Sequence, residues 1–320
     1  MGVSAPERAG ALLRVDGSGY ADVHPWPELG DAPLEEQLRG LAAGRLTPLT
    51  ARAFATARLD ALARLEGRSL FTKEKAVPRS HWLADLASAS PAELARRAVD
   101  EGFEAIKLKV GADPALEARA LAQLDEALRG REVRLRLDAN ERFERAAFEA
   151  WFSALPSTTR DRVAFVEDPY PFGAAAWAES GRRLGVKLAL DRRVSEELPH
   201  APGPLDADVI ADEPEVWILK PARDDVDALA SAAHAGLKRL VVTHSLDHPL
   251  GQAAAAFFAA ECAAEHPLLV DLCGLKAADV YEADAFSEAL VGPGPEFRAP
   301  EGTGLGFDAQ LASLRWEKLV

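Results

Sequence analysis

The chain has very few cysteines, no strongly basic stretch and no apolar run long enough to cross a membrane. Its 320 residues include only Cys262 and Cys273, and neither their number nor their spacing supports a zinc site or a disulfide framework. The net charge of −14 argues against nucleic-acid binding, which needs a basic stripe for phosphate contacts. The most apolar run, residues 253–264, contains Glu261 and is shorter than the ~20 residues that span a bilayer.

The first residues of the chain also lack the features of a targeting segment. They do not show the positive-then-apolar order of a signal peptide. Pro6 occupies the position where N-myristoylation favours serine or threonine. With 48% hydrophobic and 28% charged residues, the composition is that of an ordinary soluble globular protein. We therefore expect a cytoplasmic enzyme with a small-molecule substrate and with no nucleic-acid or membrane partner. The oligomeric state stays open.

Five apolar segments each end in an ionisable residue, and the ends are nearly evenly spaced. The intervals between successive ends are 29, 29, 24 and 29 residues, about the length of one strand–helix–strand repeat. Repeats of this kind form a parallel barrel, in which the C-terminal ends of the strands share the face that carries the chemistry. The segments are Ala105–Lys109, Val133–Asp138, Val163–Glu167, Val186–Asp191 and Val216–Lys220.

This rhythm divides the chain into a cap and a barrel. Residues 1–78 do not show it, and their one long helical stretch runs roughly from Pro48 to Glu66, with Gly67 as its C-cap, so we expect a small α+β capping domain. Residues 79–291 are expected to form an α/β barrel of the (β/α)8 type. Its three further strands are expected at residues 80–83, 239–243 and 267–271. The Gly- and Pro-rich tail, residues 292–320, is expected to return to the cap or the barrel mouth.

Three of the five strand ends are carboxylates from successive strands. Neighbouring strands lie ~4.8 Å apart, so Asp138, Glu167 and Asp191 can meet around one cation. Oxygen ligands without a histidine or cysteine partner favour Mg²⁺, or alternatively Mn²⁺, over zinc. One such acid alone would more often cap a helix or pair with an arginine. Three at the same level of a barrel predict a metal site.

Lysines stand on both sides of these carboxylates. Lys107 and Lys109 are two residues apart and point to one side of their strand, and we expect that side to be the barrel interior because Ile106 and Leu108 fill the other. Lys220 ends the sixth strand, across the barrel. A lysine near a dication and another ammonium should have a pKa lowered toward that of a general base. The arrangement suits removal of a proton from carbon, with a metal stabilising the enediolate.

These motifs resemble the enolase superfamily, in the branch with lysines on the second and sixth strands. The resemblance covers residues 80–275 and implies an enolase-like (β/α)7β barrel behind a capping domain, with Mg²⁺ and proton abstraction α to a carboxylate. That branch contains o-succinylbenzoate synthases, dipeptide epimerases, N-acylamino acid racemases and muconate cycloisomerases. The motifs are Lys107-x-Lys109, Asp138-Ala139-Asn140, Glu167-Asp168-Pro169, Asp191 and Lys220-Pro221.

The loops after strands seven and eight resemble those of the o-succinylbenzoate synthases within this branch. Hydroxyls and backbone amides there would hold a succinyl carboxylate, through Thr243, Ser245, Gly274 and Leu275. Dipeptide epimerases usually carry an Asp-x-Asp motif after strand eight, and Asp271-Leu272-Cys273 does not match it. The racemases usually show a glutamate motif after strand seven, where this chain has Asp247-His248.

The resemblance also implies a role for each charged residue. Lys109 would remove the α proton from 2-succinyl-6-hydroxy-2,4-cyclohexadiene-1-carboxylate and then protonate the departing hydroxide, a syn elimination that makes 2-succinylbenzoate for menaquinone. Lys220 would stay charged on the opposite side and stabilise the enediolate. Lys107 would keep the pKa of Lys109 low and help to bind the carboxylate. Asn140 would hydrogen-bond to the metal ligands.

Other functions remain possible on these residues. An N-acylamino acid racemase or a dipeptide epimerase would use Lys109 and Lys220 as paired bases. A barrel without catalysis could serve as a scaffold, although such a protein has little reason to keep five converging charges. A dyad of His244 and Asp247 could act as the base, but Lys220 already fills that side of the site.

Three segments depart from the family pattern or add to it. Many relatives follow the third ligand with glutamate, whereas this chain has Arg192 and Arg193, which we interpret as solvated helix ends. The cap is short, and Asp16–Tyr20 is our candidate for the loop that closes over the substrate. Gly302–Gly306 resembles a phosphate loop but follows no strand and lacks the lysine. We expect it to be a turn packed against the barrel.

Overall fold

The computed structural model describes residues 7–192, 194–198, 214–276, 282–290, 292 and 294–319. Its central element is a parallel sheet of seven strands in the order β3-β4-β5-β6-β7-β8-β9. Each strand therefore lies beside the next one in the chain, which is the order of a parallel barrel. The strands are Trp82–Ala84, Ala105–Lys109, Arg134–Asp138, Val163–Glu167, Leu188–Leu190, Val216–Leu219 and Arg239–Val242.

The segment that closes this barrel is not a regular strand, so the prediction of an eighth strand at 267–271 is wrong. The chain turns there, because the N–H groups of Leu269 and Val270 both donate to the carbonyl of His266, and Leu268 is 85% exposed. Single bridges replace the ladder: they join Leu240 to Val270, Thr243 to Gly274 and Ser80 to Cys273. These bridges link β9 to the segment before β3 and complete the ring of the barrel.

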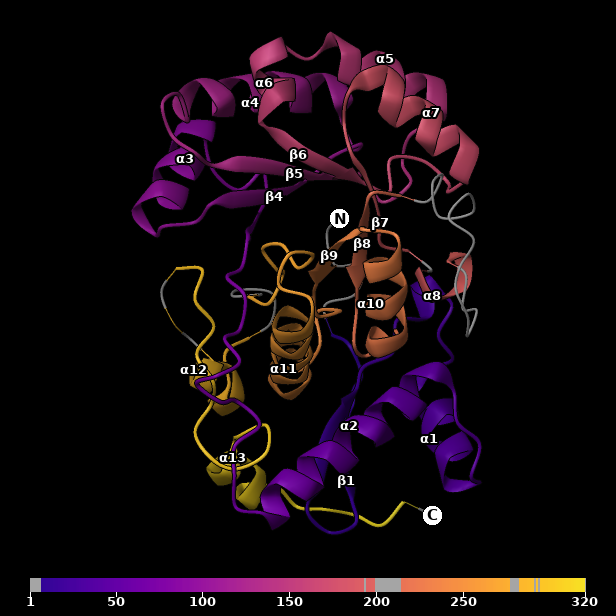
Figure 1. Cartoon of the computed structure of the whole chain (residues 1–320). Coiled ribbons are helices and arrows are strands. Elements are labelled where there is room, and N and C mark those ends of the chain that lie inside the picture. Colours follow the sequence, from indigo (N-terminus) through magenta and orange to yellow (C-terminus); the bar gives the residue numbers. More distant parts are fainter. Residues whose placement is uncertain are drawn as a thin grey trace.

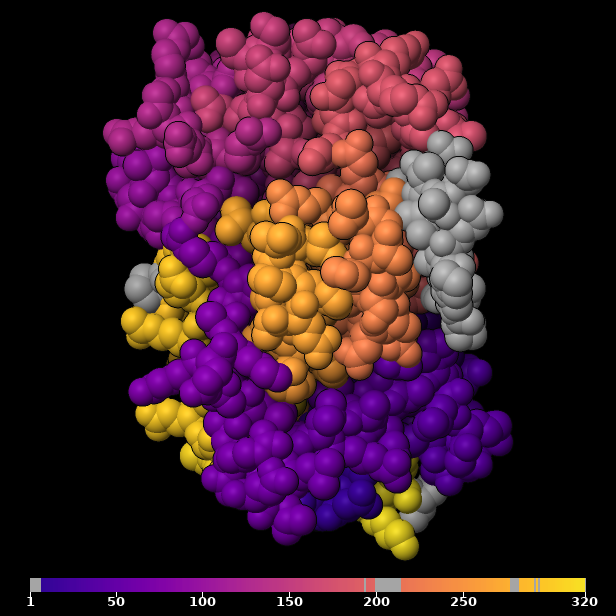
Figure 2. Space-filling view, in the orientation of Figure 1, coloured from indigo at the N-terminus to yellow at the C-terminus, as the bar shows by residue number. Residues whose placement is uncertain are grey.

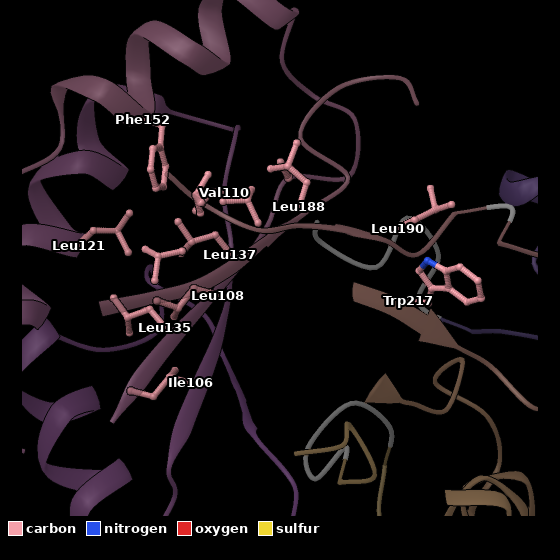
Figure 3. Packing of buried hydrophobic residues seen from close by; sticks show 14 of the residues in the cluster. Ile106, Leu108, Val110, Leu121, Leu135, Leu137, Phe152, Leu188, Leu190 and Trp217 are labelled. Carbon is pink, nitrogen blue, oxygen red and sulfur yellow. The ribbon is translucent and has the colours of Figure 1, made fainter. Parts of the chain in front are cut away.

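Helices cover the outer face of the sheet, as α3–α7 do over β4–β6 in Figure 1. Alternate strand residues point toward them: Ile106, Leu108, Leu135 and Leu137 have no exposed surface and pack in one cluster with Leu121 of α4 (Figure 3). Lys107 and Lys109, the residues between them, therefore lie on the inner face, as expected. The helices are α3 (Pro91–Asp100), α4 (Pro114–Ala127), α5 (Arg145–Ala154), α6 (Ser157–Arg162), α7 (Ala174–Leu184), α8 (Val194–Glu197), α10 (Val226–Ala235) and α11 (Pro249–Glu265).

The N-terminal region has the α+β composition that its sequence predicts. An antiparallel hairpin of β1 (Ala11–Val15) and β2 (Gly19–Val23) packs on α2 (Pro48–Leu65). Thr47 and Thr50 form a capping box at the start of α2, which satisfies two backbone donors there. Between hairpin and helix lie η1 (Pro27–Leu29) and α1 (Leu34–Ala42).

The C-terminal segment packs against both the N-terminal region and the barrel. Figures 1 and 2 show this yellow segment beside the indigo region at the lower end of the molecule. It contains α12 (Ala285–Leu290) and α13 (Asp308–Ser313), and Leu305 and Phe307 share an apolar cluster with Ala63 of α2 and Phe257 of α11. The turn at 302–306 packs against the barrel, as expected, and it also contacts α2. A side chain at Gly304 would place its Cβ 2.0 Å from the Asp60 carboxylate.

No helix in the described ranges combines the length and the hydrophobicity that crossing a membrane requires.

Candidate active site

The five charged strand ends lie at one end of the sheet. Lys109 of β4 is in register with Asp138 of β5, and Asp138 is in register with Glu167 of β6. Asp191 and Lys220 directly follow β7 and β8. Because neighbouring parallel strands end at one level, these side chains face a common space at the C-terminal mouth of the barrel.

Each carboxylate in this space contacts a lysine ammonium. Lys107 Nζ lies 2.6 and 2.8 Å from the two carboxylate oxygens of Glu167 and 3.1 Å from Asp138 Oδ2. Lys220 Nζ donates to Asp191 Oδ1. Lys109 is the least constrained, since its Nζ is 3.5 Å from Asp138 Oδ2 and its side chain is 36% exposed.

These contacts raise the pKa of two lysines, in contrast to the lowering that the sequence predicts. Burial alone would lower the pKa of Lys107, but the charges of Asp138 and Glu167 outweigh it and raise the pKa. Burial would likewise lower the pKa of Lys220, but the charge and hydrogen bond of Asp191 outweigh it and raise the pKa. The prediction assumed a dication between the lysines and the acids, whereas here ammonium and carboxylate groups touch directly.

The carboxylates are buried and crowd one another. Burial, followed by the charge of Asp138, raises the pKa of Glu167 well above its ordinary value. Burial would also raise the pKa of Asp138, but the neighbouring ammonium groups of Lys107 and Lys109 lower it. Asp138 is 4% and Glu167 1% exposed, so water does little to screen these charges. The three acids are therefore gathered where nearby positive charge, from an ammonium or a cation, stabilises their ionised forms.

The donor set fits Mg²⁺, although the side chains do not converge into a closed metal cage. Among the residues that the structure describes, no three His, Cys, Asp or Glu side chains form a group that could hold a metal ion. Instead, the Lys107 ammonium bridges Asp138 and Glu167, so one positive charge already lies between two of the three acids. Carboxylate oxygens at three adjacent strand ends are the ligands that Mg²⁺ prefers. Which residues bind metal stays a prediction.

A further acid and an arginine link the strand ends behind the carboxylates. Asp168 accepts the N–H groups of Asp191 and Arg192 at 3.1 and 3.0 Å. Arg192 Nη2 donates to Asn140 Oδ1 at 3.3 Å, and Asn140 Nδ2 donates to Asp138 Oδ1 at 2.5 Å. Arg192 is thus not a solvated helix end, and Arg193 lies outside the described residues. Asp168 stands in the Glu167-Asp168-Pro169 motif, but no role was predicted for it, because its only signal was its place between Glu167 and a proline.

The predicted substrate contacts after β9 differ in how free their polar groups are. Thr243 Oγ1 donates to the Gly274 carbonyl at 2.9 Å, and the Gly274 N–H donates to the Val242 carbonyl at 2.9 Å. The Leu275 N–H points at Ser80 Oγ, 3.4 Å away. Ser245 Oγ is buried and has no hydrogen-bond partner in the part of the chain that the structure describes. Contact of these four residues with a substrate stays a prediction, and Ser245 has the hydroxyl available for it.

The alternative base, a dyad of His244 and Asp247, has no hydrogen bond between its members in the described structure. His244 Nδ1 accepts the Leu246 N–H at 2.9 Å, and Asp247 Oδ2 accepts the Ser245 N–H at 2.9 Å. Burial, with the nearby charges of Lys220 and Lys107, lowers the pKa of His244 to about 4. A histidine bonded in this way shapes the loop and is not oriented by Asp247 as a catalytic base would be.

The part of the N-terminal region that contacts the barrel mouth is not the predicted loop, Asp16–Tyr20. Tyr20 packs on Trp316, with ring centroids 5.2 Å apart, and its N–H donates to Asp60 of α2. Instead, Trp26 Nε1 donates to the Ser245 carbonyl at 2.8 Å. The segment after β2 therefore covers the loop that carries the candidate substrate residue.

Comparison with known proteins places the chain in a family. Residues 3–63 match the model of the o-succinylbenzoate synthase N-terminal domain, and residues 90–201 match that of the enolase C-terminal domain-like family. The o-succinylbenzoate synthase of Bdellovibrio bacteriovorus is 35% identical over 321 residues, 99% of this chain and 93% of that protein. The chain belongs to the o-succinylbenzoate synthase family of the enolase superfamily. It is thus an enzyme of that superfamily, as the motifs predict.

Solved structures of this superfamily share the fold. The L-Ala-D/L-Glu epimerase of Bacillus subtilis has a TM-score of 0.70 at 18% identity, covering 93% of this chain and 89% of that one. A dipeptide epimerase of Cytophaga hutchinsonii, solved with Mg and the dipeptide D-Ala-L-Val, has a TM-score of 0.66 at 20% identity, covering 90% and 84%. At such identities the likeness confirms the enolase-type barrel of this synthase-family chain and does not define its substrate.

Proposed function

We propose that this enzyme is an o-succinylbenzoate synthase that acts in menaquinone biosynthesis. It would dehydrate 2-succinyl-6-hydroxy-2,4-cyclohexadiene-1-carboxylate to 2-succinylbenzoate. The observation that carries the proposal is the 35% identity, over 99% of the chain, to a protein of that name. The lysines on either side of a buried carboxylate cluster support it chemically, because abstraction of a proton next to a carboxylate needs a base and positive charge on opposite faces.

Lys109 is the residue we assign as base. It is the most exposed of the three lysines at the mouth and has the longest contact with a carboxylate, so its amine can turn toward a substrate. In its neutral amine form, Lys109 takes the α proton at Nζ, and the C–H electron pair moves into the substrate carboxylate as an enediolate. The pair then returns to form the ring double bond as the C–OH bond breaks. The hydroxide takes the proton back from Lys109, so one water is lost.

The other charged groups hold the substrate's negative charge. Lys220 stays protonated on the opposite side and stabilises the enediolate, which suits the rise in its pKa beside Asp191. Lys107 stays protonated and offsets the charges of Asp138 and Glu167. Asp138, Glu167 and Asp191 would hold Mg²⁺ (or Mn²⁺), which when bound supplies positive charge to the substrate carboxylate.

A racemase or an epimerase would use the same lysines as two bases. The superfamily resemblance permits this, but one contact argues against a dipeptide substrate. Asp271, the acid within the closing segment, pairs with the buried guanidinium of Arg136 at 3.2 Å. It lines the same pocket as Glu104 and Arg239 at the N-terminal ends of β4 and β9, so it does not face the mouth where a substrate ammonium would lie. We therefore favour dehydration over epimerisation.

Ultraviolet absorbance of the purified enzyme with the cyclohexadiene substrate tests the proposal. We expect loss of the diene band and appearance of the aromatic product with Mg²⁺, and neither with EDTA. If the diene persists while Mg²⁺ binds, the synthase activity is refuted. N-succinyl amino acids in deuterated solvent are then the next substrates, because a racemase would wash deuterium into recovered substrate.

A further inference from the structure

Backbone strain is concentrated next to the carboxylates. Asn140, Glu141 and Asp168 have φ values of 49°, 58° and 42°, and all three lie within three residues of the ends of β5 and β6. Residues other than glycine rarely adopt this left-handed region, which costs on the order of 1 kcal/mol or more, although Asn and Asp tolerate it best. Such a conformation persists only where neighbouring contacts hold it, and two sets of contacts do so here.

One set of contacts fixes the end of β7 to the end of β6. Asp168 is 2% exposed, and each of its carboxylate oxygens accepts one backbone N–H, from Asp191 and from Arg192. The Asp168 N–H in turn donates to the Ala189 carbonyl of β7 at 3.0 Å. The backbone that carries Asp191 is therefore held on both sides by one buried residue.

A second set of contacts returns from β7 to β5 through Arg192. The guanidinium of Arg192 can only donate, so the amide oxygen of Asn140 must face it. The amide NH2 of Asn140 is thereby left pointing at Asp138 Oδ1, to which it donates. A glutamate at position 192, which the family pattern favours, could only accept and would demand the opposite amide orientation. The arginine therefore determines which group Asp138 meets.

We propose that Arg192 is a positioning residue of the cation site, and that it acts through Asn140. It orients the Asn140 amide so that Asp138 Oδ1 stays bonded to that amide while Oδ2 faces Lys107 and Lys109, and Asp168 holds the backbone of Arg192 in place. This inference rests on the metal site of the proposed function and on no particular substrate. It also explains why an arginine is compatible with a site that must attract cations: its side chain, 25% exposed, pairs sideways with Glu141 at 3.7 Å.

A double-mutant cycle on metal affinity tests the proposal without relying on turnover. Arg192→Lys keeps the charge but ends in a shorter side chain that cannot reach Asn140. Asn140→Gly removes the amide and accepts the positive φ without strain. Mn²⁺ binding is followed by electron paramagnetic resonance of the free ion, alone and in competition with Mg²⁺. Arg119→Lys, an exposed arginine of α4, is the matched control.

We expect Asn140→Gly to weaken Mn²⁺ binding about ten-fold, the lower end of what loss of a partner behind a metal ligand costs. Arg192→Lys should weaken it at least about three-fold, and the double variant should bind no more than about two-fold worse than Asn140→Gly. The control should match wild type. If Asn140→Gly binds too weakly to titrate, the Arg192→Lys value alone decides.

Wild-type affinity in Arg192→Lys, or two effects that multiply in the double variant, would overturn the proposal. So would a loss of affinity matched by a drop in the melting temperature of the metal-free protein, since that indicates a purely structural role. A wild-type enzyme that binds no Mn²⁺ overturns this inference together with the metal site. One that binds Mn²⁺ but leaves the diene unchanged overturns the reaction only.

Discussion

Lys107 and Lys109 are two residues apart on β4, yet their surroundings predict opposite effects of mutation. Lys109 has one contact of 3.5 Å with Asp138 and a side chain 36% exposed. Lys109→Ala should therefore leave the free energy of unfolding within about 1 kcal/mol of wild type. It should lower kcat at least about 10²-fold, because it removes the general base. Steady-state kinetics and urea unfolding of the same preparation measure both.

Lys107→Met is the matched comparison. The Lys107 side chain is 14% exposed and bridges two buried carboxylates, so its loss leaves Glu167 without its ammonium partner and Asp138 with Lys109 alone. Removing one partner of a buried ion pair costs about 3–5 kcal/mol, and we expect that loss in the metal-free protein, with part of it restored by Mg²⁺. An active Lys109→Ala enzyme, or a Lys107→Met protein as stable as wild type, would refute the respective role.

At the scale of elements, the closing segment of the barrel depends on a glycine. A Cβ at Gly274 would lie 2.6 Å from Thr243 Oγ1 and 3.0 Å from His81 Cε1. Gly274→Ala should therefore push the segment away from β9 and destabilise the protein by about 1–3 kcal/mol, the usual cost of overpacking. Thermal unfolding measures the loss of stability. A higher KM should accompany that loss if the loop after β9 binds substrate.

Gly173→Ala is the control for that change. Gly173 precedes α7, and a Cβ there would meet only Ala176, at 4.0 Å. Gly173 is the N-cap of α7, where alanine is less favourable than glycine, so we expect a loss of no more than about 1 kcal/mol. If both alanine variants have the same melting temperature, close approach at Gly274 is not what closes the barrel.

The strands were predictable from the sequence to the extent that their signals were local. The even spacing of Lys109, Asp138 and Glu167 and the alternation in β4 follow from the repeat length and the two-residue period of a strand. The closing segment was missed because its apolar residues have the composition of a strand but make a turn around His266. An apolar run forms a regular strand only if the strands on both sides of it are long enough to pair with it. The composition of the run itself does not contain that information.

The contacts around the site were less predictable because they join distant parts of the chain. The hydrogen bond from Trp26 to Ser245 joins residues 219 positions apart in the sequence, and the one from Arg192 to Asn140 joins residues 52 positions apart. Asp168 could have been singled out, since an acid between a candidate ligand and a proline ends its strand and must bond locally. The pairing of Lys107 with Glu167 follows from the geometry of adjacent strands, but its effect on the lysine pKa required the structure.

At the scale of the whole molecule, buried ionisable groups gather where the N-terminal region meets the barrel. Arg223, three residues after Lys220, contacts Asp31 at 2.6 Å, and the His248 N–H donates to Asp22 of β2 at 2.9 Å. His24 lies at the end of this hairpin, 7% exposed. Burial, with the charges of Arg8 and other nearby groups, lowers its pKa from 6.5 to about 4. Packing of the two parts therefore favours a neutral imidazole.

This burial predicts a loss of stability in acid. Between pH 6.5 and pH 4 the unfolded chain protonates His24 while the folded protein does not, so the free energy of unfolding falls as the pH drops through this window. At ~1.4 kcal/mol per pKa unit, the contribution of His24 is about 3 kcal/mol, fully present above pH 6.5 and gone below pH 4.

His24→Gln removes the titrating group. Urea unfolding at pH 7 and pH 4 should show wild type losing about 3 kcal/mol more than the variant. His234→Gln, an exposed histidine of α10, should show no such difference. Parallel losses in wild type and His24→Gln would mean that the imidazole is already protonated, or hydrated, in the folded enzyme.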